Sequence, residues 1–171
     1  MHDWNLTSHP FLNTWILMSE AFEASTRAVE LELERNDTTM AQLNMLLVMD
    51  HSKVPLTPGQ ISEFTFRQQH SVSAQLSRMM RNGLVKKTRG QKDQRLVTVK
   101  MTPKGKELLD RIKPIGLGLA QDMVRESIPE GELEQFNGYL KQVRDVALQK
   151  LGKEAKPRPS TFQLPETGEA C

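Results

Sequence analysis

Residues 69–78 combine side-chain types that can bind the edges of DNA base pairs. Drawn as a helix, this stretch presents on one face and its edges the candidate residues Gln69, His70, Ser71, Ser73, Ala74, Ser77 and Arg78. Amide, imidazole and hydroxyl groups hydrogen-bond to base edges in the major groove, and an alanine methyl group can contact a thymine methyl group. The small side chains would let the helix sit deep in that groove. Arg78 and Arg81, farther along, are better placed for phosphates.

The basic stretch that follows carries a second set of candidates, namely Lys86, Lys87, Arg89, Lys92, Asp93 and Arg95. The Asp93 carboxylate, two residues from Arg95, can hold the guanidinium in one rotamer aimed at the narrow, electronegative minor groove. The lysines and Arg89 would contact phosphates without reading sequence, which makes binding depend on salt. The alternative is an exposed Asp93–Arg95 ion pair, worth only about 0–1 kcal/mol to stability.

The net charge of +2 hides an uneven distribution. Residues 67–111 hold twelve basic and three acidic residues, a net +9, whereas residues 1–66 are net −6 and residues 112–171 net −1. A basic block of this size is typical of a surface that binds a polyanion. On charge alone a solvated face is the simpler explanation, so the positions of the charges in the fold must decide.

Start signals divide the middle of the chain into short helices and a hairpin. Thr39 with Gln42, and Thr57 with Gln60, have the spacing of capping boxes, which predicts helices over about 39–50 and 57–66. The next helix is expected over about 68–82, ending at Gly83. Two β-branched, basic runs at 84–89 and 95–101 predict strands joined by a polar turn. This order predicts a helix-turn-helix followed by a basic wing.

The flanking segments predict longer helices. Residues 11–35 and 129–151 carry apolar side chains mostly at three- and four-residue steps, and a further helix begins at Thr102. We expect Pro114, Gly116 and Gly118 to kink or split that helix. The predicted fold is mainly α with a small β-hairpin wing. Its parts are an N-terminal dimerisation helix (1–38), a winged helix-turn-helix (39–111), C-terminal dimerisation helices (112–151) and a disordered tail (152–171). The competing explanation for the apolar side chains of the first and last helices is core packing within one subunit.

Seven short segments between Thr39 and Leu109 follow one another in a distinctive order. They are Thr39-Met-Ala-Gln42, Leu56-Thr57-Pro-Gly-Gln60, Ser71-Val72-Ser73, Arg78-Met79, Gly83-Leu84-Val85, Asp93-Gln94-Arg95 and Met101-Thr102-Pro-Lys-Gly105. In this order they resemble the MarR family of winged-helix transcriptional regulators. The resemblance implies a homodimeric, ligand-modulated regulator that binds a pseudopalindromic site. The sequence departs from the family pattern in two places. Gln75 stands where the family usually has an apolar residue, and the turn before the helix expected over about 68–82 lacks the usual Gly, Asp or Ser cap.

Several other classes of protein are disfavoured. The single cysteine, Cys171, rules out an internal disulfide and a cysteine zinc cluster, and the four histidines lack metal-ligand spacing. We therefore expect no metal and no cofactor. No nucleophile–base pair or phosphate-binding glycine loop can be assembled, so we expect no enzyme activity. The absence of a signal peptide and of an apolar run of about 18 residues predicts a cytoplasmic protein without membrane contact.

The resulting prediction is a sequence-specific double-stranded DNA-binding transcriptional regulator, a repressor that acts as a homodimer. A small-molecule effector is expected from the resemblance alone, and its site is unknown. The alternative is a winged-helix module that binds an acidic protein without specific DNA binding. Such a module would need neither Arg95 at the tip of the wing nor serines on the outer face of the helix.

Overall fold

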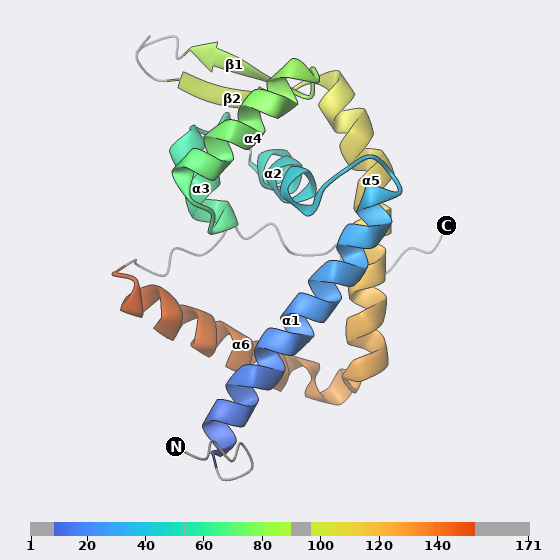
Figure 1. Ribbon diagram of the computed structural model, residues 1–171, viewed down its shortest axis with the longest axis vertical. Helices are drawn as coiled ribbons and strands as arrows, with labels where there is room; N and C mark the ends of the chain where they lie inside the picture. The colour runs from blue at the N-terminus through green and yellow to red at the C-terminus, as the bar shows by residue number, and fades with distance from the viewer. Residues whose placement is uncertain (1–8, 53, 90–96, 153–171) are drawn as a thin grey trace, which may run out of the picture.

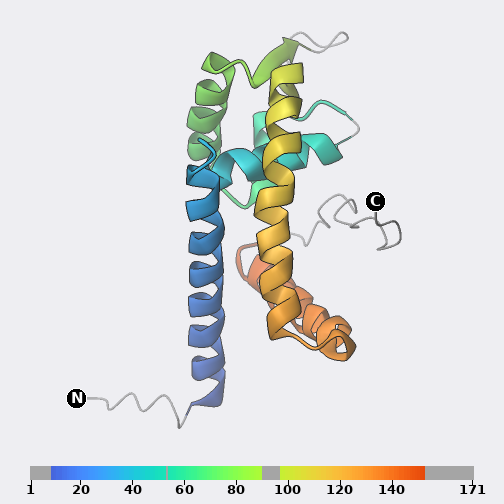
Figure 2. The same ribbon diagram turned by 90° about the vertical axis from the view of Figure 1, so that its right-hand side faces the viewer.

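The computed structural model describes residues 9–52, 54–89 and 97–152. Its elements are α1 (Pro10–Glu34), α2 (Met40–His51), α3 (Pro58–Thr65), α4 (Gln69–Arg81), β1 (Val85–Arg89), β2 (Val97–Met101), α5 (Pro103–Ser127) and α6 (Glu130–Lys150). Figure 1 shows α2, α3, α4 and the hairpin gathered in a lobe at one end. Below it, α1 runs beside α5 as a long arm (Figure 2). The predicted helical fold with a two-stranded wing is confirmed, while the predicted tail from residue 153 onward lies outside the described residues.

Both predicted capping boxes are present. The backbone N–H of Gln42 donates to Thr39 Oγ1 at 3.3 Å, and the N–H of Thr39 donates to Gln42 Oε1 at 3.1 Å. At the start of α3, the N–H of Gln60 donates to Thr57 Oγ1 at 3.2 Å, and the N–H of Thr57 donates to Gln60 Oε1 at 2.9 Å. Each box satisfies two donors that a helix start otherwise leaves free. The two capping boxes therefore fix the residues at which α2 and α3 begin.

The core of the lobe lies where α2, α3, α4 and α5 meet. Val72, Leu76 and Met79 of α4 are all buried, as their spacing predicts. They join one cluster with buried leucines of α2, Ile61 of α3 and Leu109 of α5. Burying each such side chain contributes roughly 1.5–3 kcal/mol. The inward face of α4 is therefore held firmly, and its other face is left to solvent.

The hairpin pairs in antiparallel register, with Lys86 opposite Lys100 and Thr88 opposite Thr98. Its base is joined to the lobe by the backbone N–H of Val99, which donates to the carbonyl of Leu56 at 2.8 Å. Val85 and Val99 are buried. The wing is therefore anchored to the segment before α3 as well as to the end of α4.

Of the two outcomes expected for α5 at Pro114, Gly116 and Gly118, a kink or a split, the split is wrong. α5 is one element from Pro103 to Ser127 with Pro114 inside it, and Figure 1 shows only a curved axis. The reason is packing across the arm. A Cβ at Gly116 would come within 2.7 Å of Leu43 Cδ2 and 3.6 Å of Leu33 Cδ2, so the small residue lets neighbouring helices pack closely against α5. Tertiary contact thus overrides the weak local helix propensity.

The far end of the arm leaves many apolar side chains in solvent. On α1 only Val29 and Leu33 are buried, whereas Trp15 is 62% and Phe22 70% exposed. On α6 only Leu148 is buried. Within the described part of the chain, no helix is long and apolar enough to span a membrane. A single subunit therefore accounts for only part of the apolar stripes at the two ends.

Candidate nucleic-acid interface

The turn that leads into α4 has an unusual backbone. Phe66 ends α3 in the left-handed conformation, with φ of 53°. The turn is closed by the N–H of Arg67, which donates to the Ser62 carbonyl at 3.2 Å, and by the Ser62 hydroxyl, which donates to the Arg67 carbonyl at 2.6 Å. α4 then begins at Gln69 without a side-chain cap. The Ser62 hydroxyl therefore closes the turn before α4, and α4 itself begins without a side-chain acceptor for its first N–H groups.

The outer face of α4 carries every residue that the sequence predicts there. Gln69, His70, Ser71, Ser73, Ala74, Ser77 and Arg78 are all exposed. The Ser77 hydroxyl donates to the Ser73 carbonyl at 2.9 Å, so its oxygen remains available only as an acceptor. Gln75, by contrast, is only 8% exposed. The side chains at the centre of this face are small and mostly polar, and Arg78 and Arg81 lie at its end.

The structure describes only part of the predicted wing site. Lys86 and Lys87 are exposed. Arg89 is the last residue of β1, and Lys92, Asp93 and Arg95 lie outside the described residues. The proposed aiming of Arg95 by Asp93 therefore stays a prediction.

Sequence reasoning missed Lys100, which lies directly opposite Lys86 in the hairpin. Directly opposed residues of an antiparallel pair share a face, and like charges there destabilise the sheet. Neither lysine forms an ion pair within the described residues. The signal was the period of two along residues 97–101, which could have placed Lys100 on one face. A polyanion bound to this face would relieve the repulsion.

The charges of α4, β1 and β2 are all of one sign. These elements contain no Asp or Glu, and they contain Arg78, Arg81, Lys86, Lys87, Arg89 and Lys100. By contrast, Lys106 of α5 lies 3.0 Å from both Asp50 and Asp110. Hydrogen bonds to these two carboxylates raise the pKa of the Lys106 ammonium. Among the residues that the structure describes, Lys106 is thus paired between α5 and α2, whereas Arg78, Arg81, Lys86, Lys87 and Lys100 form no ion pair.

A frame of hydrogen bonds joins the end of α4 to the start of α5. The N–H of Thr102 donates to the Leu84 carbonyl at 3.0 Å, and the Thr102 hydroxyl donates to the Gly83 carbonyl at 2.6 Å. The same hydroxyl oxygen accepts the N–H of Gly105 at 3.1 Å. Gly83 has a φ of 72°, which favours glycine. The frame holds both strands of the hairpin at a fixed position beside α4.

Comparison with known families bears on the same elements. Residues 33–96 match the model of the MarR family, a segment that contains α2, α3, α4 and β1. Residues 33–96 are a MarR-family domain. The resemblance of the ordered sequence segments is thereby confirmed, and the family is one of transcriptional regulators. No curated protein sequence matches the chain.

Solved structures of MarR-family regulators extend the likeness beyond this domain. The chain aligns with AbsC, a MarR family transcriptional regulator from Streptomyces coelicolor, at a TM-score of 0.74 and 19% identity, covering 83% of this chain and 95% of AbsC. It aligns with MepR of S. aureus in complex with DNA at a TM-score of 0.68 and 23% identity, covering 75% of this chain and 93% of MepR. It aligns with the organohalide-sensing regulator RdhR-CbdbA1625 bound to 2,4-dichlorophenol at a TM-score of 0.75 and 22% identity, covering 87% of this chain and 89% of that regulator. At these identities the likeness establishes a shared MarR-type fold that includes the arm.

Proposed function

We propose that this chain is a transcriptional regulator that binds double-stranded DNA in a sequence-specific manner. The observation that carries the proposal is the outer face of α4, which is exposed, contains no acidic residue and has small side chains at its centre. Beside it, the opposed Lys86 and Lys100 of the hairpin form no ion pair with any residue that the structure describes. α4 has 13 residues and is about 20 Å long, so its exposed face can follow several base pairs in a major groove. MepR, which has the same fold, was crystallised with DNA.

Within this interface, the two parts of the site have different roles. Gln69, His70, Ser71, Ser73, Ala74 and Ser77 contact base edges, and Arg78 contacts phosphate. Lys86, Lys87, Arg89 and Lys92 bind phosphates next to the major groove. Arg95, held by Asp93, enters the minor groove. Lys100 adds to the phosphate contacts of the wing.

The regulator acts as a homodimer on a pseudopalindromic operator. The proposal is supported by the exposed apolar side chains of α1 and α6, because apolar surface of this extent marks an interaction site. Two recognition helices related by a two-fold axis would reach half-sites about 34–36 Å apart. The dimerisation regions are 1–38 and 112–151, and they flank the DNA-binding region 39–111.

The regulator is a repressor modulated by a small molecule, and it is not an enzyme. Support comes from the family, and from the structure of RdhR-CbdbA1625 with 2,4-dichlorophenol bound. Repression follows if the bound dimer occupies a promoter that the transcription machinery must reach.

Selection of bound fragments from genomic DNA of the source organism tests this function. We expect wild-type protein to enrich a palindromic sequence. Ala74→Glu, which adds a negative charge to the exposed centre of α4, should abolish enrichment while keeping the helix, because glutamate is a good helix former. Gln121→Glu on exposed α5 is the matched control and should enrich the same sequence as wild type. Equal enrichment by Ala74→Glu, or none by wild type at low ionic strength, would contradict the proposal.

A further inference from the structure

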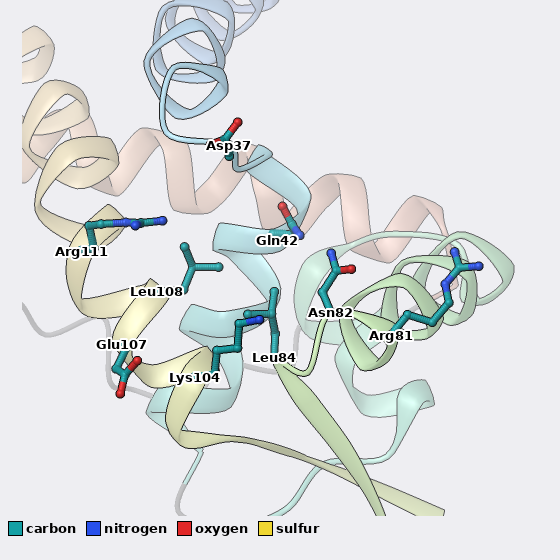
Figure 3. A pocket seen from close by; sticks show the side chains of 9 residues that line it. All are labelled: Asp37, Gln42, Arg81, Asn82, Leu84, Lys104, Glu107, Leu108 and Arg111. Atoms are coloured by element: carbon teal, nitrogen blue, oxygen red, sulfur yellow. The ribbon is translucent and has the colours of Figure 1, made fainter.

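A groove of about 800 Å³ lies between the end of α4 and the first half of α5. It is lined by Gln42, Arg81, Leu84, Lys104, Leu108 and Arg111, among others (Figure 3). We call it the α4–α5 groove. Apart from Arg81 at its edge, none of these residues belongs to the proposed DNA interface. The groove therefore needs an explanation of its own.

The groove gathers three cations, Arg81, Lys104 and Arg111. In the part of the chain that the structure describes, Arg81, Lys104 and Arg111 form no ion pair. On another face of the same helix, Lys106 and Lys113 both lie within 4.0 Å of an Asp50 oxygen. α5 thus pairs the basic residues that face α2 and leaves those that line the groove available.

The spacing of the two α5 cations suggests a long ligand. Lys104 and Arg111 are seven residues apart, which is about two turns and about 10 Å along the helix. Leu108 lies between them, and Leu84 lies beside Lys104 (Figure 3). Leu84 is buried and Leu108 is half-buried. The α5 wall therefore presents two positive ends with an apolar floor between them.

The opposite wall supplies hydrogen-bond donors. Gln42 uses its side-chain oxygen in the capping box, where it accepts from the N–H of Thr39, so its amide NH₂ remains available to a ligand. The side chains of Gln42 and Asn82 lie across the groove from α5 (Figure 3). Of the two acids that line the groove, Glu107 points away from these side chains, whereas Asp37 stands at the rim on the side of Arg111. Donors and cations thus dominate the interior.

We propose that the α4–α5 groove binds an elongated organic dianion, such as a linear dicarboxylate with an apolar spacer. One carboxylate contacts Lys104 and Asn82, the other contacts Arg111 and Gln42, and the spacer lies on Leu84 and Leu108. The inference gives a ligand class and a site to the proposed effector, and only that regulatory consequence rests on the proposed function. The binding itself requires the groove alone.

Calorimetric titration of the full chain with suberate, an eight-carbon dicarboxylate, tests the site without DNA. We expect one suberate to bind per chain. Lys104→Gln and Arg111→Gln should each weaken binding by about threefold to tenfold, because each removes one charged hydrogen-bond partner. Lys141→Gln, on exposed α6, removes the same charge elsewhere and should leave the affinity unchanged. Since DNA is absent, failure here and failure of the DNA-binding proposal are separate results.

Two further measurements examine charge and length. Asp37→Asn should tighten suberate binding about twofold or more, because it removes a negative charge from the rim. Asparagine also tolerates the left-handed backbone of Asp37, whose φ is 54°. Succinate is too short to reach both cations and should bind about tenfold more weakly than suberate. The absence of suberate binding, equal affinity for succinate, or an equal loss in Lys141→Gln would overturn the proposal.

Discussion

The variant Gly105→Ala places a methyl group where the start of α5 meets the segment that joins α4 to β1. The added Cβ would overlap the carbonyl oxygen of Leu84 and lie 2.9 Å from Met101 Cγ. The Met101 side chain can move, but the Leu84 carbonyl is held by the N–H of Thr102 at 3.0 Å. Relief of the overlap therefore requires a shift of the backbone that joins α4 to the wing.

The size of the effect follows from two opposing terms. Overpacking of a well-packed site costs typically 1–3 kcal/mol, and a rigid backbone places this site at the upper end. Alanine in place of glycine inside a helix returns about 0.5–1 kcal/mol. We therefore expect Gly105→Ala to lower the free energy of unfolding by about 2 kcal/mol. A loss of this size is a large fraction of the 5–15 kcal/mol typical of a folded domain.

Urea unfolding followed by circular dichroism measures this change, at one fixed protein concentration because dimerisation would add to stability. Gly118→Ala is the matched control on the same helix, since a Cβ there meets nothing within 4 Å. It should leave stability unchanged or raise it by up to about 1 kcal/mol. If both variants behave alike, the close contact between α5 and the Leu84 carbonyl is not a constraint, and the reasoning about the frame fails.

Three further predictions concern the wing, the α2–α5 contact and the arm. Lys100→Thr should raise the free energy of unfolding by up to about 1 kcal/mol, since it removes the charge opposite Lys86, and should weaken DNA binding; a loss of stability in urea unfolding would contradict this. Lys106→Met should cost about 1 kcal/mol or less at pH 7, because Lys106 is 47% exposed. The pKa of Lys106 is raised above 10.5, so its stabilising effect is complete below pH 10.5 and disappears as the pH rises through the raised pKa. If the difference in the free energy of unfolding between wild type and Lys106→Met shrinks between pH 7 and 10, this prediction is refuted. Phe22→Ser should shift a dimer toward monomer in sedimentation, whereas Glu23→Ser should not; unchanged association would exclude the exposed face of α1 from the interface.

Local signals explain which parts of the fold were predictable. The starts of α2 and α3 depend on residues three positions apart, Thr39 with Gln42 and Thr57 with Gln60, so the sequence contains the whole interaction. The inward face of α4 follows in the same way from helical spacing. The exposed residues of the outer face could likewise be named in advance.

Interactions between distant segments were not predictable. Asp50 and Lys106 are 56 residues apart, and no local pattern indicates their pairing. The continuity of α5 depends on Gly116 packing against Leu43 of another helix. The α4–α5 groove likewise brings together residues from the α1–α2 turn, α2, α4 and α5. For the stripes of α1 and α6, one subunit shows which side chains it buries, and the proposed dimer would account for the others.

Selection from randomised duplexes tests the central claim, that the outer face of α4 reads bases while the wing holds phosphates. We compare wild type with His70→Ala on α4 and Lys87→Ala on β1. His70→Ala should change which bases are preferred at particular positions of the site. Lys87→Ala should weaken binding to all sequences alike and reduce the slope of log K against log salt concentration by about one. Identical preferences and identical salt slopes for the two variants would contradict the account.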